Sequence, residues 1–279
     1  MKRFRKIYLE ISNRCNLSCA FCPGTKRQKR ALSREEFALL LPKLSPWTDH
    51  LYFHLMGEPL CHPLLGEFLE MAGSAGFKVI LTTNGTLLRR SQEMLLSAGG
   101  LHKVNISLHA FEANDLDMPF EEYLAGCFEF GLSAEGKKIV TYRLWNSGGQ
   151  DEENGRIIAV LEKYFPRPWH TGRRGIRIGQ NIYLEHGDKF DWPDLSADDG
   201  GDRVFCYGLK DQIGVLCDGT VVPCCLDHEG DIALGNLFEQ SMEDILAAPR
   251  TQAMAEGFAR GRASEELCRK CGYARAKFG

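Results

Sequence analysis

The sequence lacks the features that would carry the chain out of the cell or into a membrane. The N-terminal stretch Met1-Lys-Arg-Phe-Arg-Lys reaches Glu10 before any apolar segment of export-signal length can form. No run approaches the roughly 18 apolar residues that a membrane span requires. We therefore expect a cytoplasmic protein with no membrane partner.

An excess of positive charge is also missing, as are internal repeats and low-complexity segments. The formal net charge of -3 argues against nucleic acid as a partner. The 279 residues, 44% hydrophobic and 25% charged, are typical of an ordinary globular chain. This length favours about two domains.

Cysteine, by contrast, is abundant, with eleven residues. In a chain without an export signal, these indicate metal ligands or catalytic thiols rather than disulfides. Three thiols stand close together in Cys15-Asn-Leu-Ser-Cys19-Ala-Phe-Cys22, directly after an apolar segment that reads as a strand. Such a set suits an iron-sulfur cluster. Because no fourth cysteine follows locally, one iron would stay open to another ligand.

This spacing, with Phe21 before the last cysteine, resembles the cluster loop of the radical S-adenosylmethionine (SAM) enzymes. The resemblance implies that Cys15, Cys19 and Cys22 hold a [4Fe-4S] cluster whose open iron is chelated by SAM, with Phe21 nearby. An electron from the cluster would split SAM into methionine and a 5'-deoxyadenosyl radical that takes a hydrogen atom from the substrate. A structural zinc loop is the alternative, but zinc sites close with four ligands at paired spacings.

The first two-thirds of the chain alternates expected strands and helices, which implies a parallel sheet with right-handed crossovers. A capping box at Ser33 and Glu36 starts the first helix. Six units fall short of the eight that close a barrel. We therefore expect an α/β fold, a partial (β/α)6 TIM-type barrel over residues 1–187. The expected strands cover residues 7–11, 51–55, 77–81, 104–108, 138–144 and 176–184.

In such barrels the reactive groups lie at the C-terminal ends of the strands. Gly57-Glu58-Pro59 follows the second strand, where a carboxylate beside a permissive glycine suits a ligand's ammonium group. The family's Gly-Glu-Pro motif contacts the amino group of SAM in this way, although a plain turn would use the same residues. Thr82-Thr83-Asn84, at the end of the third strand, would bind polar parts of SAM or cap the next helix.

Further candidates follow the next strands. By resemblance, Ser107 and Arg143 would reach the ribose or carboxylate of SAM, although Arg143 could equally be a surface residue. His54 and His109 are weak candidates for a catalytic acid or base, and point into the barrel only if the strand register is right. The basic run at residues 26–30 would attract an anionic substrate or form a solvated loop.

Composition changes after Leu184. Residues 188–205 are rich in aspartate and read as a linker, and residues 206–279 hold six cysteines. The layout Cys206-x17-Cys224-x43-Cys268-x2-Cys271 is similar to the auxiliary-cluster twitch domain, the shortened relative of the SPASM domain. The resemblance implies a second [4Fe-4S] cluster on these four residues.

Some alternatives stay open for this region. Cys225 adjoins Cys224 and would replace it as a ligand, and Cys217 lies in an expected hairpin within reach. A zinc ribbon also uses Cys-x2-Cys pairs.

The overall layout resembles the dehydrogenases that act on 2-deoxy-scyllo-inosamine. A carbon radical beside oxygen or nitrogen is a strong reductant, so an auxiliary cluster would accept its electron while a base takes a proton. The expected function is oxidation of an unknown small molecule, with flavodoxin or ferredoxin as electron donor.

Peptide modification, by thioether formation or epimerisation, is the alternative within the family. Against it, the first strand begins at about residue 7 and leaves no room for an N-terminal peptide-binding domain. A noncatalytic iron-sulfur or zinc-binding module is the alternative from another class.

Overall fold

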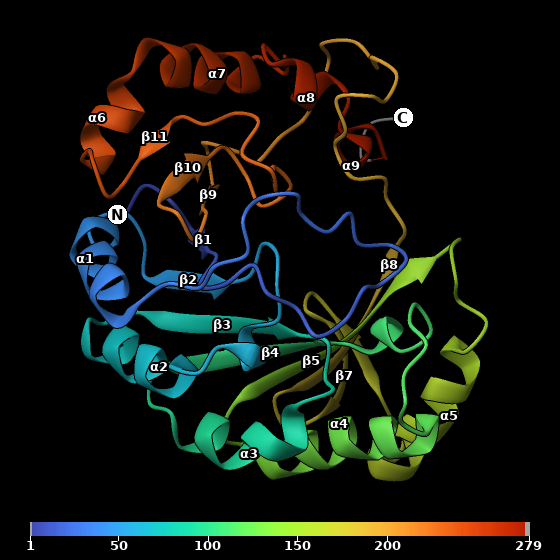
Figure 1. Cartoon of the computed structure of the whole chain (residues 1–279). Helices are drawn as coiled ribbons and strands as arrows, with labels where there is room; N and C mark the ends of the chain where they lie inside the picture. The colour runs from blue at the N-terminus through green and yellow to red at the C-terminus, as the bar shows by residue number, and fades with distance from the viewer. Residues whose placement is uncertain (1, 277–279) are drawn as a thin grey trace.

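The computed structural model describes residues 2–276, and the strands within them form one continuous sheet (Figure 1). Eleven strands of the described chain take part, in the order β11-β10-β9-β1-β2-β3-β4-β5-β8-β7-β6. Their bounds are Lys6–Leu9 (β1), His50–Phe53 (β2), Lys78–Thr83 (β3), Leu101–Ser107 (β4), Ile139–Ser147 (β5), His170–Gly172 (β6), Gly175–Gly179 (β7), Ile182–Asp188 (β8), Gln212–Val215 (β9), Thr220–Val222 (β10) and Gly235–Asn236 (β11).

Among the described residues, five α-helices accompany the first strands, and four more belong to the C-terminal segment drawn at the top of Figure 1. The helices are Arg34–Leu44 (α1), Leu65–Ser74 (α2), Leu88–Ser97 (α3), Phe120–Ala134 (α4), Asn154–Tyr164 (α5), Met242–Ala247 (α6), Pro249–Ala259 (α7), Glu266–Arg269 (α8) and Gly272–Ala276 (α9). None of the helices described is both long enough and apolar enough to cross a bilayer.

The predicted parallel sheet is confirmed, since the strands from β9 through β1 to β5 and β8 all run parallel. The predicted capping box is present as well. Ser33 Oγ accepts a hydrogen bond from the Glu36 N–H at 3.1 Å, and the Glu36 carboxylate accepts one from the Ser33 N–H at 2.8 Å. Local signals therefore place the first units of the barrel correctly.

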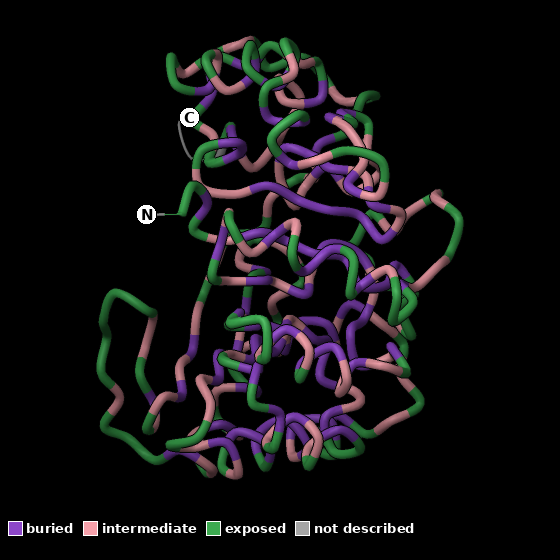
Figure 2. Tube along the Cα trace, turned by 90° about the vertical axis from the view of Figure 1, so that its left-hand side faces the viewer, coloured by how far each residue is buried: buried purple, intermediate pink, exposed green. Residues whose placement is uncertain are grey.

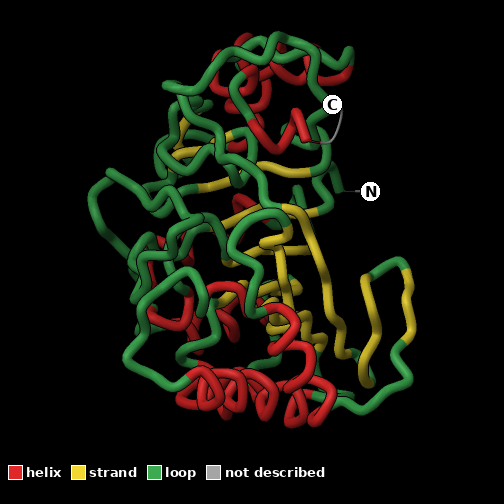
Figure 3. The backbone as a smooth tube through the Cα atoms, turned by 90° about the vertical axis from the view of Figure 1, so that its right-hand side faces the viewer, coloured by secondary structure: helices red, strands yellow, loops and turns green. Residues whose placement is uncertain are grey.

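The prediction of one strand over residues 176–184 is wrong. This segment forms two strands, β7 and β8, joined by a tight turn in which Asn181 has a φ of 65°. Asparagine tolerates this left-handed conformation, which reverses the chain. The parallel partner of β5 is β8, while β7 and β6 form an antiparallel hairpin at the edge of the sheet (Figure 3).

The two faces of the parallel sheet differ in character. Side chains alternate along each strand, and residues such as Ile7, Val104 and Val140 pack in the main core with the residues of α1 to α5. The opposite face, here called the inner face, carries polar and charged side chains instead. The inner face bears Lys6, Tyr8, Tyr52, His54, Thr82, Lys103, Asn105, Ser107, Arg143, Trp145 and Glu185.

The C-terminal segment extends this sheet. Strand β9 pairs in parallel with β1, from Lys6 beside Gln212 to Leu9 beside Val215, and β10 folds back on β9 as the sequence predicts. Buried residues of the segment, such as Leu237 and Met254, belong to the same core as the first strands. Figure 2 shows buried residues continuing from the sheet into the C-terminal segment.

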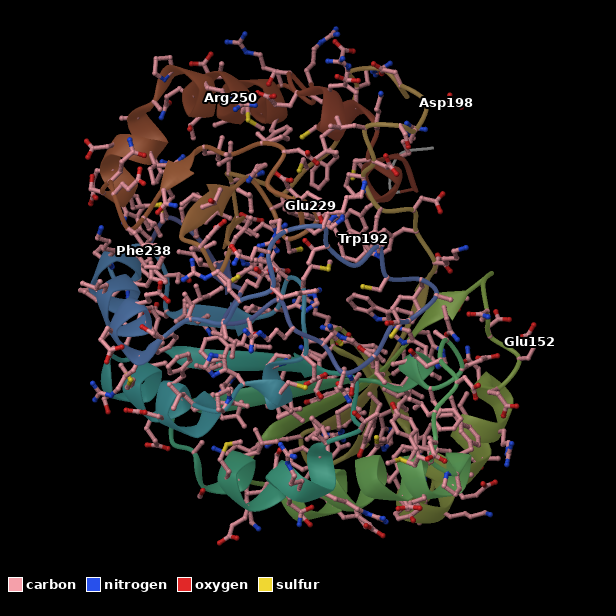
Figure 4. The ribbon with its side chains drawn as sticks, viewed as in Figure 1. Glu152, Trp192, Asp198, Glu229, Phe238 and Arg250 are labelled. Carbon is pink, nitrogen blue, oxygen red and sulfur yellow. The ribbon has the colours of Figure 1, made fainter. Side chains whose placement is uncertain are left out.

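A buried ion pair fastens residues 13–30, here called the cysteine loop, to the C-terminal segment. Arg27 contacts the carboxylate of Glu10 with both terminal nitrogens, at 2.9 and 2.7 Å, and its Nε donates to the carbonyl of His228 at 2.8 Å. The Glu10 side chain is fully buried and also accepts a hydrogen bond from the Cys217 N–H at 3.2 Å. Figure 4 shows Glu229, whose carboxylate accepts from the Lys26 N–H at 3.0 Å, beside Trp192 in this region.

Replacement of Arg27 by glutamine is expected to lower the free energy of unfolding by about 3 kcal/mol, because the Glu10 charge would stay buried without its partner. The matched control is Arg34→Gln, which breaks the exposed pair between Arg34 and Glu67 and is expected to change little. Urea unfolding followed by circular dichroism, at equal cluster content, measures both. An equal loss in the two variants would contradict the structural role of the buried pair.

Candidate active site

The cysteine loop follows the C-terminal end of β1, and Asn13 forms hydrogen bonds across the base of the loop. The buried side chain of Asn13 donates to the Gln28 carbonyl and accepts from the Arg30 N–H, both at 2.9 Å. The two ends of the loop are thereby held together, and the segment between them projects its cysteines outward.

The three predicted cluster ligands share this loop. Cys15 and Cys22 are exposed and Cys19 is half-buried. The sulfur of Cys15 accepts from the Leu17 N–H at 3.4 Å, and that of Cys19 accepts from the Asn114 side-chain amide at 3.1 Å. Donors of this kind tune the potential of iron-sulfur clusters.

Burial raises the pKa of Cys15 and Cys19, and the neighbouring charge of Cys22 raises both further. Without a metal, Cys15 and Cys19 would stay protonated near neutral pH. Ligation by a metal releases such protons, so three accessible soft donors at this position fit an iron-sulfur cluster.

Gly57 follows β2 and lies against the backbone that leads from β1 into the cysteine loop. Its φ is 83°, and a Cβ placed there would lie 2.3 Å from the Ser12 carbonyl oxygen and 2.9 Å from that of Arg14. The next residue, Glu58, donates its N–H to the Arg14 carbonyl at 2.8 Å. Only glycine permits this approach, as the sequence motif suggested.

The carboxylate of Glu58 connects the segments that follow β2 and β3 through hydrogen bonds. It is 2% exposed and accepts hydrogen bonds from the Leu60 N–H at 3.0 Å and the Asn84 N–H at 2.7 Å. Burial raises its pKa to about 7. The side chain of Asn84 in turn donates to Asn16 in the cysteine loop at 3.0 Å. The structure therefore brings Glu58 and Asn84 next to the cysteine loop.

The remaining predicted SAM contacts divide between the two faces of the sheet. Thr82 and Ser107 lie on the inner face, and Thr82 Oγ accepts from Asn105 at 3.2 Å. Thr83 is buried on the other face, where its hydroxyl accepts from the Gly85 N–H at 3.1 Å and so shapes the turn. Pro59 is the buried first residue of a short 3₁₀ turn.

Phe21 of the cysteine loop packs on His109, with ring centroids 4.9 Å apart. His109 Nδ1 lies 3.1 Å from the Arg143 carbonyl oxygen and 3.4 Å from the Trp145 backbone nitrogen, so it donates to the first or accepts from the second according to its tautomer. Burial lowers the pKa of His109 to about 4, and burial beside the charges of Arg143 and Lys6 lowers the pKa of His54 to about 3. Both histidines are therefore neutral and weak proton acceptors near pH 7.

Arg143 lies on the inner face. Its neighbours there were not identified from the sequence. Its Nε lies 3.5 Å from the Glu185 carboxylate, and its guanidinium stacks on Trp145 with 4.2 Å to the ring centroid. Lys103 Nζ approaches Glu185 at 3.7 Å. The alternation of charged and apolar residues in these strands is the sequence feature that could have identified them.

Four cysteines far apart in sequence line one cavity in the C-terminal segment. The cavity is partly open to solvent, and its lining includes Cys206, Cys224, Cys268 and Cys271. Burial raises the pKa of Cys206 to about 11 and also raises that of Cys224 and Cys268. Within residues 2–276, no three His, Cys, Asp or Glu side chains are arranged around a single metal ion.

The two other cysteines of this segment lie outside the cavity lining. Cys217 is buried beside Glu10 and Arg27, whose Nη1 lies 3.9 Å from its sulfur. Cys225 packs with Tyr8 and Tyr52 on the inner face.

Gly57→Ala is expected to displace the cysteine loop, because the added methyl group would collide with the β1 exit. Iron bound after anaerobic reconstitution should fall by about half, from about eight to about four per chain. Gly76→Ala is the matched control, since Gly76 has a φ of 84° but open space around it. Equal iron loss in both variants would contradict this explanation, because backbone strain alone would then account for the loss.

His109 should make stability depend on pH. Its folded pKa lies below the unfolded value of 6.5, so the unfolded chain binds the proton more tightly. The stabilisation is complete above about pH 6.5 and is lost as pH falls toward about 4, by about 3 kcal/mol at most. Urea unfolding across this range should show a shallower slope for His109→Gln than for the parent; equal slopes would contradict the burial argument.

Comparisons with known proteins agree with this geometry. The Radical SAM superfamily model matches residues 9–126, and the SPASM iron-sulfur cluster-binding domain model matches residues 206–272. The S-adenosyl-L-methionine-dependent 2-deoxy-scyllo-inosamine dehydrogenase of Niallia circulans is 22% identical over 97% of this chain and 93% of its own length.

A tungsten-containing aldehyde ferredoxin oxidoreductase cofactor-modifying protein of Pyrococcus furiosus is 31% identical over 64% of this chain, which spans only 50% of that relative. Two solved structures share the fold. BtrN in complex with AdoMet and 2-DOIA has a TM-score of 0.64 at 21% identity, covering 97% of this chain and 94% of its own. Streptococcus suis SuiB bound to precursor peptide SuiA has a TM-score of 0.60 at 15% identity, covering 98% and 72%.

Proposed function

Because the chain belongs to the radical SAM superfamily and carries a SPASM iron-sulfur domain, we propose that it oxidises a small molecule by two electrons. The family establishes an enzyme that uses SAM, a [4Fe-4S] cluster and auxiliary iron-sulfur binding, so a noncatalytic or zinc-only module is excluded. When bound, the reduced cluster supplies the electron that cleaves SAM to methionine and a 5'-deoxyadenosyl radical able to abstract hydrogen.

Cys15, Cys19 and Cys22 would hold the first cluster, because they are accessible on a loop that Asn13 closes. The SAM site would lie beside them. Gly57 brings the end of β2 against this loop, and the Glu58–Asn84 contact orders the end of β3. Of the other predicted contacts, Thr82, Ser107 and Arg143 would face SAM from the inner face and Phe21 from the cysteine loop, whereas Pro59 and Thr83 are buried and would shape the neighbouring turns.

The cavity lined by Cys206, Cys224, Cys268 and Cys271 is the observation that carries the oxidation proposal. Four thiols can close a cluster completely, leaving no iron open to substrate. A closed cluster suits electron transfer, and its role would be to accept the second electron from the substrate. The full-length likeness to a dehydrogenase supports the same reaction.

Peptide modification is the second candidate, supported by the shared fold with SuiB bound to its precursor peptide.

The electron donor would be a flavodoxin or ferredoxin. A reducing cytoplasm would suit the chain, because none of its eleven cysteines, all within the described residues, forms a disulfide.

Iron content and nucleoside formation separate the two cysteine sets. Protein reconstituted anaerobically should bind about eight irons per chain and form 5'-deoxyadenosine with dithionite and SAM. A Cys15/Cys19/Cys22→Ala variant should lose about half the iron and all nucleoside formation. A Cys268/Cys271→Ala variant should lose the other half and keep nucleoside formation, but stop forming oxidised product.

Cys217→Ser, Cys225→Ser and Cys127→Ala serve as controls and should retain the parent's iron. Full iron in the Cys268/Cys271→Ala variant, or iron loss only in Cys225→Ser, would contradict the four-cysteine cavity as the auxiliary site. Zinc in place of iron, with no nucleoside formed, would contradict the proposed function itself.

A further inference from the structure

The inner face holds a charged group in which only Arg143 is also a proposed contact of SAM. Three cations, Lys6, Lys103 and Arg143, lie on it with the carboxylate of Glu185, and we call these four residues the charged floor. The side chains are partly buried, with 14% exposure for Arg143 and 23% for Lys103 and Glu185. They border space that solvent still reaches.

The cations of the charged floor are incompletely neutralised. Glu185 contacts two of them only at 3.5 and 3.7 Å, and the buried Nε of Arg143 lacks a hydrogen-bond partner among the described residues. Lys6 Nζ lies over the rings of Tyr8 and Tyr52, 4.9 and 5.1 Å from their centroids, with Arg5 and Asp211 acting on it with opposite signs. Partly buried positive charge of this kind is costly unless an anion joins it.

The pKa shifts of the three cations also indicate that their charge is incompletely neutralised. Burial lowers the pKa of Lys6, Lys103 and Arg143, and the charge of Arg143 lowers the pKa of both lysines further. Arg143 therefore repels each of the two lysines in the free protein. A bound anion would relieve this repulsion.

The two lysines of the charged floor lie deeper in the barrel than the residues expected to hold SAM, whereas Arg143 and Glu185 lie level with Ser107 in the strand register. Lys103 precedes Ser107, the C-terminal end of β4, by four residues, which is roughly 13 Å along a strand, and Lys6 is the first residue of β1. Glu58 and Asn84, by contrast, lie at the C-terminal strand ends beside the cysteine loop. A molecule resting on the charged floor would occupy the space beneath SAM.

On the basis of the proposed function, we propose that the substrate carries an anionic group, a carboxylate or a phosphate, which Lys6, Lys103 and Arg143 bind on the charged floor. The rest of the substrate then extends toward the strand ends, where hydrogen abstraction takes place. The aromatic rings of Tyr8, Tyr52 and Trp145 flank the cations. The substrate class is thus an organic acid or phosphate ester.

Binding of inorganic phosphate to the reconstituted protein, measured by isothermal titration calorimetry, tests this proposal without radical chemistry. The parent should bind phosphate saturably, with and without saturating SAM. Lys6→Gln/Lys103→Gln should weaken binding about tenfold or more, because two charge-assisted contacts are lost. Lys6→Arg/Lys103→Arg should retain binding, and so should the matched surface control Lys137→Gln.

Absence of saturable binding of both phosphate and acetate by the parent, or equal phosphate affinity in the glutamine variant, would overturn the proposal. Displacement of phosphate by SAM would also overturn it, because the anion would then be the carboxylate of SAM itself. Nucleoside formation without substrate, measured on the same samples, tests the proposed function separately. Anion binding without nucleoside would refute that function, and nucleoside without binding of either phosphate or acetate would refute only the anionic substrate.

Discussion

The parallel pairing of β1 with β9 is the interaction on which the rest of the structure depends. β1 ends in the loop that carries Cys15, Cys19 and Cys22, while the hairpin of β9 and β10 leads directly into Cys224. One pair of neighbouring strands therefore connects both cysteine sets, and the Glu10–Arg27 pair ties the cysteine loop to the C-terminal segment over the same edge. The separation of the two sets is fixed by the sheet rather than by a flexible linker.

Local signals made much of this predictable. The three-cysteine spacing, the capping box at Ser33 and the glycine at position 57 each act within a few residues, so the sequence alone identifies them. The break between β7 and β8 was missed because a single asparagine, Asn181, makes the turn. Arg27 looked like part of a solvated basic run, because its partner Glu10 and the carbonyl of His228 approach it only in the folded chain.

The inner face explains why the substrate could not be derived from sequence. Lys6, Lys103 and Glu185 come from separate strands, and only the register of the sheet brings them together around Arg143. Their positions on one face also required knowing that β8, not β7, is the neighbour of β5. The cofactor chemistry is thus encoded in short motifs, whereas substrate recognition is encoded in the pairing of strands.

Pulsed electron-nuclear double resonance on the reduced protein tests the central claim, that the cysteine loop holds a cluster with one iron open to SAM. SAM labelled with ¹⁵N at its amino group should show direct hyperfine coupling to the reduced cluster in the Cys268/Cys271→Ala variant, where only the cluster on Cys15, Cys19 and Cys22 is expected. Saturating SAM without any nitrogen coupling would contradict the claim, because the cluster and SAM would then bind at separate sites.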